Sequence, residues 1–127
     1  MAQIYHALGL HLHQPLGNLL ALHNSPEKWE ADQILWCYDR ITRMLEGYED
    51  IARLHISCSG TLLKQFEDPA IRETFKNVVN IGDIIERFKK SPIQFVGSGI
   101  YHPVYPLIPQ EDWDAQTEYW QGLGRHL

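Results

Sequence analysis

Three short apolar runs divide the chain and predict β-strands. They cover residues 4–11, 54–58 and 93–96. Runs of this length that are closed by turn-forming residues are typical of strands buried in a sheet. The closing residues are Pro15 and Gly17 after the first run, Gly60 after the second, and Gly97 and Gly99 after the third.

A long helical pattern lies between the first two predicted strands. Apolar residues recur three and four positions apart over residues 26–49, which predicts a helix. Ser25 followed by Pro26 is typical of a helix start, because serine caps free amides and proline tolerates the first helical position. Trp29 and Trp36 lie about two turns apart on this helix. We expect both rings to pack in the core.

Shorter helical patterns follow the second and third predicted strands. We expect helices over 62–76 with a break at Asp68 and Pro69, over 78–89, and over 110–123. The resulting order β-α-β-αα-β-α favours parallel strands joined by right-handed crossovers. Strand 54–58 is expected to be apolar on both faces, as parallel strands commonly are.

A parallel sheet of three strands leaves two open edges, which suggests an incomplete architecture. We expect strands of another copy or chain, or the rest of a larger barrel, to complete it. Unpaired strand edges promote association, so self-association of the chain is expected.

Composition and charge narrow the class of protein. With 127 residues, 44% hydrophobic and 21% charged, the chain is long enough for one globular domain. Eleven basic against sixteen acidic residues give a net charge of -5, which disfavours nucleic acid as a partner. The first residues lack the charge pattern of a signal peptide and the length of a membrane span, so no membrane partner is expected. Cys37 and Cys58 are expected to be reduced thiols inside two different elements, which suits the cytoplasm.

The motif HLHQP at residues 11–15 carries the strongest chemical signal. Side chains alternate along a strand, so His11 and His13 point to one side at its carboxyl end. Ligands of α/β folds bind at this end of the strands. We expect the two imidazoles to contact a ligand; the alternative is a pair of ordinary polar residues at a strand end.

Two further motifs follow the other predicted strands. At the end of the second strand, Ser57 and Ser59 offer hydrogen bonds to sugar hydroxyls, although Ser59 or Thr61 could instead cap the next helix. After the third strand, aromatic rings on a proline-stiffened loop offer a platform for the apolar faces of sugars. The alternative is a rigid surface loop packed on the core. The candidate residues in this loop are Gly97, Gly99, Tyr101 and His102.

The order HLHQP, ISCSGTLLKQF and QFVGSGIYHPVYPLIP resembles the start of the catalytic domain of glycoside hydrolase family 57. This family comprises amylases, glucanotransferases and branching enzymes that act on α-glucans. The resemblance implies an α/β fold in which residues 1–127 are the first three βα units of an irregular seven-stranded TIM-like barrel, truncated at its C-terminal side. It also implies that His11, His13 and Gln14 contact the donor sugar and that Gly97, Gly99 and Tyr101 form the next lining segment.

The same resemblance limits the chemistry expected of this chain. Members commonly carry Glu where this sequence has His102, and the catalytic Glu and Asp of the family lie on later strands. We therefore assign no catalytic residue here and expect no cofactor or metal; the expected partner is an α-glucan or oligosaccharide. Two alternatives stay open. One is a non-catalytic glycan-binding or assembly module, and the other is a metal-dependent hydrolase that adds His55 or His102 to the histidine pair.

Overall fold

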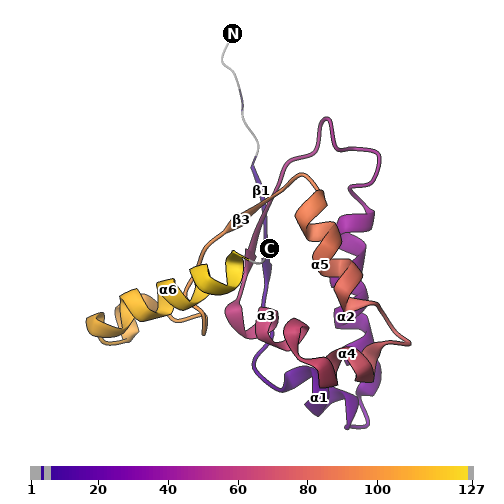
Figure 1. The fold of residues 1–127 in the computed structure, drawn as a ribbon, viewed down its shortest axis with the longest axis horizontal. Helices are drawn as coiled ribbons and strands as arrows, with labels where there is room; N and C mark the ends of the chain where they lie inside the picture. Colours follow the sequence, from indigo (N-terminus) through magenta and orange to yellow (C-terminus); the bar gives the residue numbers. More distant parts are fainter. Residues whose placement is uncertain (1–3, 5–6, 126–127) are drawn as a thin grey trace.

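A parallel sheet of three strands forms the centre of the computed structural model, which describes residue 4 and residues 7–125 (Figure 1). The strands are β1 (Leu8–Leu12), β2 (Leu54–Cys58) and β3 (Ile93–Val96), with β2 in the middle. The second and third strands match the predicted ranges. The first begins later than predicted and includes Leu12, while positions 5 and 6 of the predicted run lie outside the described residues.

Six α-helices and two 3₁₀ turns are described around the strands. They are α1 (Asn18–His23), α2 (Lys28–Arg43), α3 (Gly60–Glu67), α4 (Pro69–Phe75), α5 (Ile81–Lys90), η1 (Tyr105–Leu107), η2 (Gln110–Asp112) and α6 (Trp113–Gly124). Helices α1, α2, α4 and α5 lie on one side of the strands, and α6 extends on the other side (Figure 1). None of the described helices combines the length and apolar character that crossing a membrane requires.

Local capping explains where the helices differ from the predicted ranges. Helix α1 was not predicted, and α2 ends at Arg43, before Gly47 adopts a left-handed φ of 84° that helical residues do not have. Ser25 does not cap α2, since the N-cap is Glu27. The predicted break at Asp68 is confirmed, because the Asp68 carboxylate accepts the Ala70 N–H at 2.8 Å and starts α4.

The two faces of the sheet differ in character. Alternate residues of β2 are buried against the helices, whereas His55 and Ser57 point to the other face and are half-buried. The prediction that this strand is apolar on both faces is therefore wrong: the LHISC alternation gives it one apolar and one polar face. The apolar face belongs to the core, together with Leu35, Phe66, Phe75, Ile84 and Phe88.

Two side chains expected in the core of α2 are exposed. Trp29 and Trp36 keep 59% and 42% of their surface, and Cys37, also predicted to be interior, is exposed. Helix α2 buries one stripe, and these three residues fall outside it. The Trp36 indole N–H instead donates to the Val78 carbonyl at 3.3 Å. The buried stripe consists of Ala31, Leu35, Tyr38 and Thr42.

Helix α6 is attached to the sheet by one buried indole. The Trp120 N–H donates to the Cys58 carbonyl at the end of β2, at 2.6 Å. The same ring lies against Gly97, where an added Cβ would meet it at 3.3 Å. Trp120 therefore connects α6, the end of β2 and the loop after β3.

Candidate functional site

The carboxyl end of β1 presents two imidazoles on the polar face of the sheet. Leu12 is buried in the core, and His11 and His13 on either side of it point to the opposite face, as strand alternation predicts. Gln14 behaves differently. Its amide donates to the Tyr38 hydroxyl at 3.2 Å and accepts from the Asn18 amide at 2.6 Å, so both ends of the side chain are engaged by α1 and α2.

Buried polar side chains fix the backbone of this motif. The Tyr38 hydroxyl donates to the His13 carbonyl at 3.3 Å. The Gln65 amide, buried in α3, donates to the Pro15 carbonyl at 2.9 Å and approaches the Gln14 carbonyl at 3.3 Å. Sequence reasoning missed both residues. The one available signal was Gln65 itself, a polar residue among the apolar positions of a predicted helix.

The two serines at the carboxyl end of β2 have different surroundings. Ser57 is half-buried and pairs in register with His11, so it borders the histidine pair. Ser59 is fully buried, its hydroxyl accepts the Leu62 N–H at 3.3 Å, and it shares a hydrogen bond with Thr61. Ser59 therefore caps α3, as the alternative prediction stated, and does not lie with the histidines at the surface.

Close backbone approach brings the loop after β3 onto the start of α3. At Gly60 an added Cβ would lie 2.8 Å from the Ile100 carbonyl oxygen. Within the loop itself, an added Cβ at Gly99 would lie 2.5 Å from the Pro103 Cγ atom. The Thr61 N–H donates to the Ile100 carbonyl at 3.1 Å. Glycine at these two positions therefore allows the loop to reach the carboxyl edge of the sheet.

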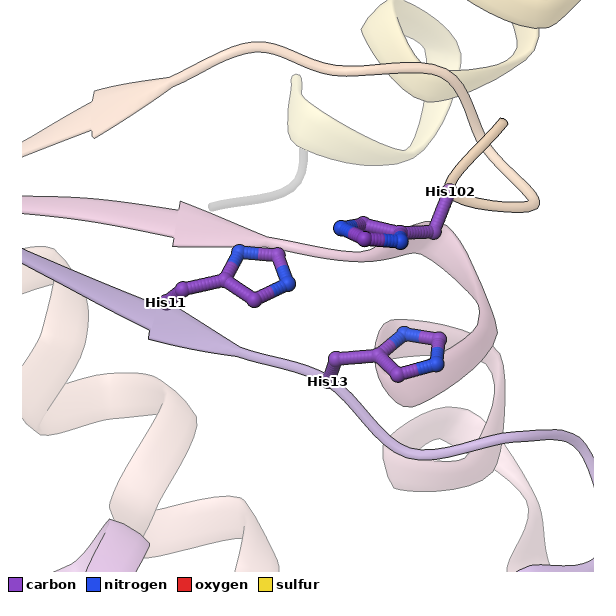
Figure 2. Close-up of side chains that lie close together, drawn as sticks. All are labelled: His11, His13 and His102. Carbon is purple, nitrogen blue, oxygen red and sulfur yellow. The ribbon is translucent and has the colours of Figure 1, made fainter. Parts of the chain in front are cut away.

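His102 turns from this loop toward the two histidines of β1 (Figure 2). Its φ of 56° is left-handed, which is uncommon for a residue other than glycine. The centroid of its ring lies 4.5 Å from that of His11 and 4.7 Å from that of His13, and the latter two are 6.1 Å apart. One ring nitrogen from each residue lies within 4.8 Å of the other two. We call His11, His13 and His102 the histidine cluster.

Tyr101 and Gly97 lie near His102 in sequence, but they do not belong to the histidine cluster. Tyr101 keeps 52% of its surface exposed to solvent, and its hydroxyl accepts a hydrogen bond from the Lys64 ammonium at 3.4 Å. Gly97 is exposed beside Trp120. Lys64 also lines a cleft of about 590 Å³ between α3 and α6, together with Glu67, Glu118 and Tyr119. Sequence reasoning did not identify this cleft, because it depends on how α6 packs.

Burial favours the neutral form of two imidazoles, those of His11 and His13. It lowers the pKa of His11 and of His13, and the neighbouring charge of His102 lowers both pKa values further. The His13 Nδ1 atom is buried, and no described residue offers it a hydrogen-bond partner. The cluster contains no Asp or Glu. The rings of His11 and His13 therefore offer neutral nitrogen donors and acceptors.

Comparison with known proteins gives one family and several relatives. The family model "Glycosyl hydrolase family 57" matches residues 7–125. A 4-alpha-glucanotransferase of Thermococcus litoralis is 27% identical over 100% of this chain and 17% of its own length. An alpha-amylase of Pyrococcus horikoshii is 27% identical over 100% of this chain and 18% of its own length. An alpha-amylase of Pyrococcus abyssi is 30% identical over 88% of this chain and 15% of its own length. No solved structure matches the chain significantly. The chain thus spans less than a fifth of the length of these relatives.

Proposed function

Because the chain belongs to glycoside hydrolase family 57, we propose that it contributes the sugar-binding face of an α-glucan hydrolase or transferase domain. The observation that supports this most is the meeting of His11, His13 and His102 beside Ser57 at the carboxyl edge of a parallel sheet. Barrel enzymes bind their substrates at this edge. The substrate class follows from relatives named 4-alpha-glucanotransferase and alpha-amylase.

Each exposed group has a chemistry that suits a sugar. Neutral imidazoles exchange hydrogen bonds with sugar hydroxyls, and the exposed ring of Tyr101 suits the apolar face of a pyranose. Lys64 joins Tyr101 to the cleft between α3 and α6. We propose that a glucan chain runs from the histidine cluster past Tyr101 to this cleft.

The catalytic acids are proposed to come from strands beyond β3. Retaining glycoside hydrolysis needs two carboxyl groups about 5 Å apart, and the histidine cluster contains none. In this proposal β1–β3 are the first three strands of a barrel, with α1, α2, α4 and α5 outside and the polar face of the sheet inside. The edges of β1 and β3 would then pair with further strands or with a second copy, which light scattering at low micromolar concentration tests.

Binding of maltooligosaccharides to the purified chain tests the sugar-binding role. We expect His13→Ala and Tyr101→Ala to weaken binding, while Lys76→Ala, at an exposed residue directly after α4, leaves it unchanged. No α-glucan turnover above background is expected from this chain alone. Binding that both site variants leave intact would refute the proposed surface. Turnover lost in Glu111→Gln or Asp112→Asn would show that an acid of this chain does the chemistry.

A glycan-binding module without catalysis is the second candidate, and the absence of Asp and Glu from the histidine cluster favours it. The two candidates differ in what completion of the domain does. If the chain binds glucan and turnover appears when the remaining barrel strands are supplied, the enzyme is supported. Binding that persists without turnover in the completed domain supports the module.

A further inference from the structure

We propose that His11, His13 and His102 together bind a divalent transition-metal ion, with Zn²⁺ the best-matched ion. Imidazole is the commonest protein ligand for such ions, and three protein ligands with an open position are typical of reactive zinc sites. This proposal does not depend on the sugar-binding role, because metal binding is measured without sugar.

The distances within the cluster bring the three ligands near to coordination. One nitrogen of each ring lies within 4.8 Å of the other two. Tetrahedral zinc with Zn–N bonds of about 2.0–2.1 Å places its ligand atoms about 3.3 Å apart. The difference is small enough for side-chain rotation. No hydrogen bond among the described residues holds any of the three rings in place, so rotation breaks no hydrogen bond.

A second observation points to a ligand inside the cluster. The His13 Nδ1 atom is buried without a hydrogen-bond partner among the described residues, and a buried polar atom without one is costly. The His102 ring lies 4.7 Å from the His13 ring, centroid to centroid. An ion coordinated by the Nδ1 atom of His13 would give this buried atom the partner that it lacks.

The backbone places the third imidazole where the ion needs it. His102 adopts a left-handed φ of 56°, a conformation that costs a side chain of this size some energy. The contact between Gly60 and Ile100 holds the loop, and the loop carries His102 over the ends of β1 and β2 (Figure 2). Two ligands come from one strand and the third from a segment almost ninety residues later, so the folded chain preorganises the set.

The exposure of the cluster leaves room for an exchangeable ligand. His11 and His102 are both exposed, so a coordination position would face solvent. Water or a sugar hydroxyl would fill it. Three neutral ligands leave the full charge of the ion uncompensated, which favours such an oxygen ligand.

Titration of the metal-free full chain with Zn²⁺ and with Co²⁺ tests the site. We expect one ion per chain by calorimetry, with Co²⁺ giving visible absorbance of a low-coordinate nitrogen site. All chains carry Cys37→Ser, His6→Gln and His126→Gln, which remove other ligands for the ion. His102→Gln should lower the affinity by more than the roughly 10- to 100-fold that loss of an outer-shell partner produces. His23→Gln, a histidine of α1 outside the cluster, is the matched control and should leave the affinity unchanged.

A second measurement uses the chain with all three ligands present. Paramagnetic Co²⁺ should shift the imidazole resonances of His11, His13 and His102 most strongly. His55, on the same face of the neighbouring strand, should shift less, and His23 should stay in place. The proposal is overturned if no ion binds at micromolar concentration, if His102→Gln binds as tightly as His23→Gln, or if Co²⁺ shifts His55 or His23 more strongly than the three proposed ligands.

Discussion

Adding one methyl group at Gly60 tests how the loop after β3 is held. Gly60 is the first residue of α3, and its added Cβ would lie 2.8 Å from the Ile100 carbonyl oxygen and 3.0 Å from the Ile100 Cα. Backbone atoms cannot rotate away as the end of a side chain can. Gly60→Ala therefore pushes the buried Ile100 and the loop that carries His102 away from α3.

The structure sets the expected size of this effect. Overpacking of a dense site costs about 1–3 kcal/mol. The displacement also stretches the hydrogen bond from the Thr61 N–H to the Ile100 carbonyl, which is 3.1 Å long, and an unpaired buried group costs about 1–3 kcal/mol. Alanine in a helix recovers at most about 1 kcal/mol. With the middle value of each range, the free energy of unfolding should fall by about 3 kcal/mol.

Gly122→Ala in α6 is the matched control, because an added Cβ there meets nothing within 4 Å. The same chemical change should raise the free energy of unfolding by about 0.5–1 kcal/mol through helix propensity. Urea unfolding followed by circular dichroism measures both. With a urea dependence of about 2 kcal/mol per molar, the Gly60→Ala midpoint should fall by roughly 1.5 M. Equal midpoints for the two variants would show that α3 and the loop do not pack as described.

Three further tests address the buried indole, the thiols and the imidazoles. Trp120→Phe removes the donor to the Cys58 carbonyl and should lower the free energy of unfolding by about 1–3 kcal/mol in urea titration; an unchanged midpoint contradicts the buried hydrogen bond. Burial raises the pKa of the Cys58 thiol to about 12, so a disulfide reagent should modify Cys37 alone in the native chain and both thiols in urea. Fast native labelling of Cys58 would contradict its burial. Burial lowers the pKa of His11 and His13 below the usual 6.5, so the unfolded chain takes up protons first and stability should fall as the pH drops below about 6.5. Melting temperatures of the metal-free chain between pH 7.5 and 5 check this. A variant with both His11→Asn and His13→Asn should show a shallower dependence of melting temperature on pH.

Strands β2 and β3 were predictable to the residue because their boundaries are local. Gly60 and Gly97 follow them within two residues, and their apolar runs are short. Helix α1 was not predictable in this way, since six residues give little periodicity. Trp29 and Trp36 were wrongly predicted to be buried. Their spacing of about two turns puts them near one face of α2, but the stripe that contacts the core is narrower and excludes both.

The candidate site was also predictable only where local sequence determines it. The shared side of His11 and His13 follows from strand alternation alone, and both were predicted. His102 was identified as a candidate by its motif, but its position depends on a left-handed backbone and on the approach of Ile100 to Gly60. Those contacts join segments distant in sequence. The engagement of Gln14 by Tyr38 and α1 is likewise a tertiary fact that no local pattern contains.

The pleat of the sheet separates the side chains that fill the core from the side chains that face away from it. Leu54, Ile56 and Cys58 enter the core, while His55 and Ser57 between them face away from it. A saturation scan across the strands should therefore show tolerance that alternates with a period of two. Selection can then rewrite the outward residues one at a time without repacking the interior. Divergence in binding within such a sheet proceeds by alternate positions, at little expense to folding.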